Sequence, residues 1–140
     1  MNNSVPKSQL TREMMEQAIA LSPYTNWVGT RLLDFDPGHV KILIAVRREM
    51  TQHHGFVHGA IVGYMADTVC SWAAASVVGD VVTSEYKLNL LAPAIGEELM
   101  AVGEVIKAGG RQVVTRADVF AVKGGAEKIV ATALATIARV

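Results

Sequence analysis

The residues with the clearest potential for chemistry lie where a histidine- and glycine-rich segment, residues 51–59, meets a long apolar segment. His58 and Gly59 stand at that junction, which is the expected start of a helix. A helix start presents free backbone N–H groups and the positive end of the helix dipole. Such a site suits an oxyanion or a polarised carbonyl oxygen, and Gly59 has no side chain to keep a ligand away from its backbone.

Asp67 is the second candidate, because it is a carboxylate within an apolar segment. Burying it unpaired would be costly, so we expect Asp67 to have a partner or a function. It lies eight residues beyond Gly59, which is about 12 Å along a helix axis. One chain therefore cannot bring both residues to the same carbonyl group. Two subunits with antiparallel helices could do so, and a two-fold dimer would then hold two equal sites.

The segment from residue 60 to 78 is nearly all apolar or small, and it is long enough to span a bilayer. Asp67 in its middle would cost about 3 kcal/mol in a membrane, and no Lys or Arg flanks either end closely. We therefore interpret the segment as the buried central helix of a soluble domain. This helix is expected to run from about His58 to Val78 and to be closed by Gly79.

Shorter patterns on both sides of this helix predict one more helix and six strands. Thr11 is expected to cap the short helix, and Ser22-Pro23 to end it. Alternation of apolar and polar residues predicts the strands. They are expected at residues 28–33, 40–47, 83–91, 97–107, 111–122 and 127–138.

The strand at 83–91 has the cleanest alternation. One face is expected to carry Tyr86, Leu88 and Leu90, and the other Glu85, Lys87 and Asn89.

A single helix cannot bury itself and needs a sheet around it. The predicted fold is therefore α+β: a long central helix wrapped by a curved, mostly antiparallel sheet of about six strands. Residues 1–140 are expected to form one domain, with residues 1–10 as a flexible N-terminus. The helix has no charged stripe to face water, so its uncovered face is expected to meet a second copy of the chain.

Composition narrows the function classes. The 140 residues are 51% hydrophobic and 19% charged, and 13 basic residues balance 13 acidic ones. This balance argues against a nucleic-acid binder. Cys70 is the only cysteine, so an intrachain disulfide is impossible. No signal peptide is evident, and we expect a cytoplasmic protein that does not enter a membrane.

Two sequence motifs resemble those of a known family. The first is Gly55-x-x-His58-Gly59-Ala60 followed by Asp67, and the second is Thr83-x-Glu85-x-Lys87-Leu88-Asn89-Leu90-Leu91-Ala92-Pro93-Ala94. Both are similar to motifs of the hotdog-fold acyl-CoA thioesterases of the PaaI type, within the 4-hydroxybenzoyl-CoA thioesterase superfamily. Gly110-Arg111 resembles a later turn of that family, and the similarity runs from about residue 23 to 140. The resemblance implies hydrolysis of acyl-CoA thioesters at the interface of a homodimer, with dimers pairing further.

The resemblance also implies residue roles. Asp67 corresponds to the catalytic nucleophile or general base, Gly59 to the oxyanion-hole donor, and His58 to the histidine that supports the loop. Thr83 falls near the attacking water. Two positions depart from the family, because Gln52 replaces a common Asn and Ala60 a second Gly; Ala60 keeps its backbone N–H. Three cations could receive the coenzyme A phosphates: Lys87, Arg111 and Arg116.

Several alternatives remain open from the sequence. Asp67 could be structural, the three cations could lie on solvated strand faces, and Met14-Met15 could line an acyl pocket or only pack the first helix. His54 and His58 have a spacing that could bind zinc on a helix, but Gly55 between them favours a loop, so neither a metal nor a cofactor is expected. The protein could also be a non-catalytic acyl-CoA or lipid-binding module, or a hydroxyacyl-thioester dehydratase that uses His58 and Asp67.

Overall fold

The computed structural model describes residues 10–140, so the expected flexible N-terminus, except Leu10, lies outside the described residues. The chain contains three α-helices, one 3₁₀ turn (Arg48–Met50) and six strands over this range. The helices are α1 (Arg12–Leu21), α2 (Pro23–Val28) and α3 (Gly59–Val78). The strands are β1 (Arg31–Asp36), β2 (His39–Ala45), β3 (Val81–Leu90), β4 (Glu98–Ala108), β5 (Gln112–Lys123) and β6 (Ala126–Arg139).

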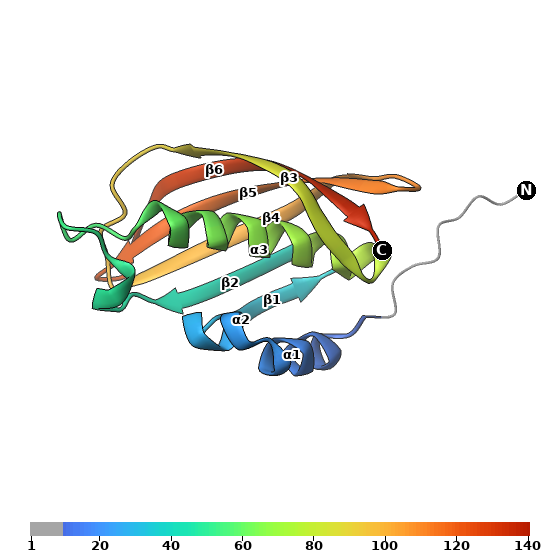
Figure 1. Ribbon diagram of the computed structural model, residues 1–140, viewed down its shortest axis with the longest axis horizontal. Helices are drawn as coiled ribbons and strands as arrows, with labels where there is room; N and C mark the ends of the chain where they lie inside the picture. Colours follow the sequence, from blue (N-terminus) through green and yellow to red (C-terminus); the bar gives the residue numbers. More distant parts are fainter. Residues whose placement is uncertain (1–9) are drawn as a thin grey trace, which may run out of the picture.

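The strands form one sheet in the order β1-β2-β4-β5-β6-β3, and every neighbouring pair is antiparallel. Figure 1 shows the sheet curving around α3, with α1 and α2 beside the β1 edge. The predicted α+β architecture with a central helix is therefore confirmed. Strands β1 and β3 are the two edges, and β3 has a paired neighbour on one side only within the described chain.

Helix α3 begins and ends where the sequence indicated. His58 is its N-cap and Gly79 its C-cap, and its apolar side chains fill the concave side of the sheet. Very close packing against β4 depends on Gly103, because a Cβ there would lie 2.5 Å from the backbone oxygen of Val69. By length and hydropathy alone α3 could cross a membrane. Its burial against the chain's own sheet is instead the arrangement of a core helix.

The N-terminal region partly departs from prediction. Thr11 caps α1 through a hydrogen bond accepted from the Met14 N–H, as expected. The strand predicted from Val28 is wrong at its start, because Pro23–Val28 is a second helix. Proline suits the first turn of a helix, and Gly29 ends α2 in the left-handed conformation with φ of 82°.

Strand β3 also departs from prediction at one residue. Its pairing with β6 shifts between Thr83 and Glu85, so Ser84 is a bulge. Thr83 pairs with the buried Ile137, whereas Glu85 pairs with Thr136 and accepts its hydroxyl hydrogen bond. The bulge therefore turns Thr83 to the helix side, opposite to Glu85, so the predicted alternation is interrupted at Ser84.

Beyond the bulge the predicted alternation holds. Strand β3 turns Tyr86, Leu88 and Leu90 towards α3, where they approach Gly63 and Gly59. Thr83 lies on the same side as these three residues despite its opposite parity in the sequence.

Candidate active site

The N-terminus of α3 presents one backbone donor. The His58 Nδ1 accepts a hydrogen bond of 2.9 Å from the Ala60 N–H, and the N–H groups of Ile61 and Val62 donate to the His58 carbonyl. Within residues 10–140 the Gly59 N–H has no such partner. Gly59 therefore keeps the role of free donor, while the Ala60 N–H, expected to remain available, is already occupied.

Gln52, in the preceding loop, lines the same pocket as Gly59. A β-bridge between Thr51 and Val57 closes the loop. Within it, the Gln52 carbonyl accepts a hydrogen bond from the Gly55 N–H, and the Gln52 N–H donates to the Phe56 carbonyl. The Gln52 Oε1 accepts a hydrogen bond from the His54 N–H. This leaves the Gln52 side-chain NH₂ as the group that can donate to a ligand.

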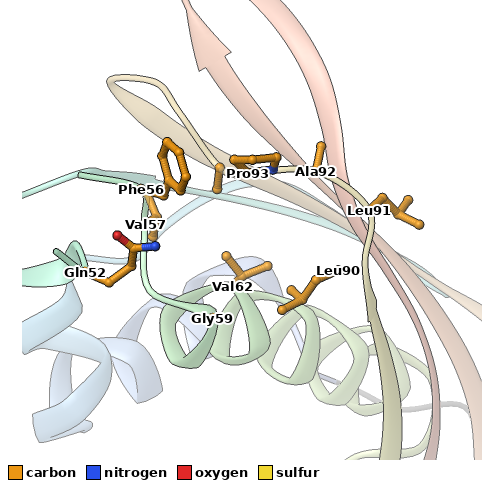
Figure 2. A pocket seen from close by; sticks show the side chains of 10 residues that line it. Gln52, Phe56, Val57, Gly59, Val62, Leu90, Leu91, Ala92 and Pro93 are labelled. Atoms are coloured by element: carbon orange, nitrogen blue, oxygen red, sulfur yellow. The ribbon is translucent and has the colours of Figure 1, made fainter. Parts of the chain in front are cut away.

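Gln52 and Gly59 line one pocket of about 400 Å³, called here the Gln52–Gly59 pocket. Figure 2 shows Gln52 and Phe56 on the loop side, Gly59 and Val62 on α3, and the chain from Leu90 to Pro93 on the other side. Most of these walls are apolar. Two polar donors in an otherwise apolar pocket are typical of a site that orients a carbonyl group.

Asp67 lies further along α3 and has a partner. The Thr83 hydroxyl donates a hydrogen bond of 2.7 Å to the Asp67 Oδ1. Asp67 is half-buried, on a helix stripe that also carries Ala60, Tyr64 and Ser71, the least-buried face of α3. This stripe carries one charged side chain, that of Asp67.

The structure brings the predicted catalytic residues together in two groups rather than one. Gly59, Gln52 and His58 lie at the start of α3, whereas Asp67 and Thr83 lie about 12 Å along its axis. The Gln52–Gly59 pocket does not include Asp67. The inference that one chain cannot direct both groups at one carbonyl therefore has a structural basis.

The three candidate phosphate-binding cations lie apart from this pocket. Lys87 is exposed on the outer face of β3, and Arg111 is exposed in the turn before β5. Arg116 is on the outer face of β5, where it forms an ion pair of 3.0 Å with Glu104. None of the three lines the Gln52–Gly59 pocket in one chain, so their role in coenzyme A binding stays a prediction.

Sequence reasoning missed several contributors. Leu90, Leu91 and Pro93 line the pocket. The second sequence motif contains all three but does not by itself indicate this role. Their position directly after the strand that faces the helix start was the available signal. Among residues 10–140, no group of three His, Cys, Asp or Glu side chains could hold a metal ion.

Comparison with known proteins places the chain in a family. The sequence model described as "Thioesterase superfamily" matches residues 54–128, which is more than half of the chain. The chain belongs to the thioesterase superfamily. No curated protein sequence matches this superfamily member.

Solved structures agree with this assignment. A thioesterase family protein from Silicibacter pomeroyi is 35% identical, with a TM-score of 0.85 over 88% of this chain and 93% of that one. A conserved protein from Pseudomonas aeruginosa is 26% identical, with a TM-score of 0.80 over 94% and 100% of the two chains.

The PaaI protein from the phenylacetic acid degradation operon of E. coli shares the fold. It is 21% identical, with a TM-score of 0.80 over 90% of each chain. The predicted hotdog fold and membership of the thioesterase superfamily are thus confirmed, and thioester hydrolysis is the class of activity that this membership supports.

Proposed function

We propose that this thioesterase superfamily member hydrolyses acyl-CoA thioesters in active sites shared by two subunits. The observation that carries the proposal is the Asp67–Thr83 hydrogen bond on the least-buried face of α3. A carboxylate there can reach a ligand from outside the chain, and the Thr83 hydroxyl fixes one of its two oxygens. The second oxygen, Oδ2, remains to act on water or on the thioester carbon.

The reaction needs two contributions from the protein. Attack on a thioester develops negative charge on the carbonyl oxygen, and one well-placed N–H donor lowers the barrier by about 3 kcal/mol. The Gly59 N–H supplies this donor, and the Gln52 NH₂ is a second one in the same pocket. Asp67 either removes a proton from the attacking water or attacks the carbon itself. The coenzyme A thiolate then leaves. Where Asp67 is the nucleophile, a water molecule hydrolyses the resulting acyl-Asp67 anhydride, which releases the acid and restores the carboxylate.

A shared site follows from the positions of these groups. Asp67 of one subunit would face the Gly59 N–H of the other if two α3 helices lay antiparallel across a two-fold axis. Strand β3 favours such an assembly, because it is a ten-residue edge strand with a row of backbone groups that β6 does not pair. Pairing of two β3 edges would continue the sheet from one subunit to the other.

Activity on a panel of acyl-CoA substrates, followed with a thiol-reactive dye, tests the reaction. Asp67→Asn should keep the fold and lower turnover by about 100-fold or more, because the amide can neither accept the proton nor attack. Turnover within threefold of the parent would overturn the role of Asp67. Tight binding of acyl-CoA with no release of thiol by the parent would support the non-catalytic module instead.

Mixing two inactive variants tests the shared site. Gly59→Val is a suitable partner for Asp67→Asn, because a Cβ at Gly59 would meet only Leu90 at an ordinary 3.4 Å. Co-refolding should restore up to about a quarter of the parent activity, since half the dimers are mixed and each mixed dimer has one intact site. No recovery from confirmed heterodimers, or a fully active monomer by sedimentation, would contradict the shared site.

A further inference from the structure

A second cavity of about 400 Å³ lies between α1 and the C-terminal half of α3. It is called here the α1–α3 cavity. Met15 and Ala18 contribute from α1, Ser71 and Trp72 from α3, and Val81 from the start of β3. Its lining is largely apolar, and its volume falls in the range of small-molecule sites.

The α1–α3 cavity begins about one helical turn beyond Asp67, which together with Thr83 lies outside its lining. Ser71 lies one helical turn after Asp67 on the same half-buried stripe of α3. Val81 lies two residues before Thr83 and therefore on the same side of β3, facing the helix. From Ser71 the lining continues to Gly79, so the cavity follows α3 for about 12 Å away from Asp67.

We propose that the α1–α3 cavity holds the acyl group of the substrate and that this group is uncharged and apolar. The inference rests on the proposed function, in which the thioester carbon lies at Asp67. From that point the acyl group extends along α3 between Met15 and Trp72. If each carbon takes somewhat less than the ~30 Å³ of a water molecule, the cavity of about 400 Å³ sets an upper limit of roughly fourteen carbons. A straight chain of medium length or an aryl group with a short linker fits within that limit.

The charges around the cavity select against acidic acyl groups. Among the residues from position 10 onwards that line it, none is Lys or Arg, and Asp80 lies at its far end. A carboxylate at the end of a dicarboxylic acyl group would have no cation to pair with and would meet the Asp80 charge. Succinyl-CoA and similar substrates are therefore excluded.

Helix α1, which forms one wall of the cavity, is anchored by Met15, Ile19 and Arg12. Met15 is the only buried side chain of α1, and Arg12 ties the helix to β1 through the carbonyls of Leu32 and Leu33. Ala18 is exposed at the cavity and can accept a larger side chain without entering the core. These features make Ala18 a suitable position for a test.

The experiment compares Ala18→Phe with Gln17→Phe, a control on the neighbouring exposed position of α1 that does not line the cavity. Straight-chain substrates from acetyl- to palmitoyl-CoA, phenylacetyl-CoA and succinyl-CoA form the panel. Ala18→Phe should lower kcat/KM for decanoyl-CoA by about tenfold or more and leave acetyl-CoA within twofold. Gln17→Phe should change neither, and succinyl-CoA should be the poorest substrate of the parent.

A Trp72→Leu variant would enlarge the cavity and should move the preferred chain length upwards. The straight-chain and phenylacetyl arms show which apolar acyl group fits best. An equal loss on all chain lengths with Ala18→Phe, or efficient hydrolysis of succinyl-CoA, would overturn the proposal.

A binding measurement separates this inference from the proposed function. Decyl-CoA, a thioether that cannot be hydrolysed, is titrated by calorimetry into the Asp67→Asn protein with and without Ala18→Phe. The added Phe should weaken binding by about tenfold, even if no thioester is ever hydrolysed. Unchanged binding would place the acyl group elsewhere, whatever the activity assays show.

Discussion

The Thr83 hydroxyl lies 2.7 Å from the Asp67 Oδ1 and donates its hydrogen bond to that oxygen. The two residues are sixteen positions apart and come from the edge strand β3 and the central helix α3. This bond orients the carboxylate while leaving it half-exposed. Asp67 is therefore held in place from within its own chain and is open to a ligand from outside it.

Removal of the Thr83 hydroxyl tests whether this positioning matters for turnover. Thr83→Val keeps the shape of the side chain and should lower kcat by about tenfold, because Asp67 loses the donor that fixes its orientation. Thr83→Ser retains a hydroxyl and should recover most of the rate. Steady-state kinetics with separate kcat and KM values makes the comparison. Equal kcat values for Val and Ser would contradict a positioning role.

The His58 cap predicts an effect on stability. His58→Ala leaves the Ala60 N–H without its acceptor and should lower the free energy of unfolding by about 1 kcal/mol. His58→Asn supplies another capping oxygen and should lose less. Urea denaturation at neutral pH measures both variants. If Ala and Asn variants are equally stable, the imidazole contributes through something other than the cap.

Substitution of Gly103 is expected to lower the free energy of unfolding more than substitution of His58. A Cβ at this position would lie 2.5 Å from the Val69 carbonyl oxygen, so Gly103→Ala must push α3 away from β4. We expect a loss of more than about 2 kcal/mol. Gly110→Ala is the matched control, because a Cβ there meets nothing within 4 Å. Thermal and urea unfolding should leave this control near the parent.

Burial, with a contribution from the Asp67 charge, raises the pKa of the Cys70 thiol from 9.0 to about 11. A thiol reagent at pH 8 should therefore label the unfolded chain and leave the native protein unlabelled. Between about pH 9 and 11 the unfolded thiol ionises while the folded one keeps its proton. Stability should fall over that interval in the parent, and less so in Cys70→Ala. Rapid native labelling would contradict the burial of this side chain.

Most of the architecture could be predicted because its elements have simple apolar periods. The bounds of α3 agree closely because His58 and Gly79 are strong cap signals on either side of an apolar run. Strands β4, β5 and β6 are joined by glycine turns that the sequence makes plain. Cap residues and glycine turns of this kind mark where a helix or strand begins and ends.

The second helix was missed for a specific reason. Val28, Thr30 and Leu32 are all buried, as alternation indicated. The pattern therefore described burial correctly, but Val28 ends α2 rather than beginning a strand. Alternation across a helix end and a strand start looks the same as alternation within one strand.

The candidate site was predictable in its residues more than in its geometry. Asp67 and Thr83 were identified separately, whereas their hydrogen bond depends on the Ser84 bulge, which no alternation pattern reveals. The occupied Ala60 N–H likewise depends on the rotamer of His58. Both features arise from three-dimensional packing rather than from the local sequence.

Because of the Ser84 bulge, the site depends on the number of residues in β3 as well as on their identity. Ser84 supplies the one extra residue that lets Thr83 and Tyr86 face the same side of β3. A substitution at this position keeps that count, whereas a deletion would rotate either Thr83 or the Tyr86–Leu90 face away from α3. Two homologous chains could thus share every polar side chain of this site and still differ in whether it is assembled, through one missing residue in a strand.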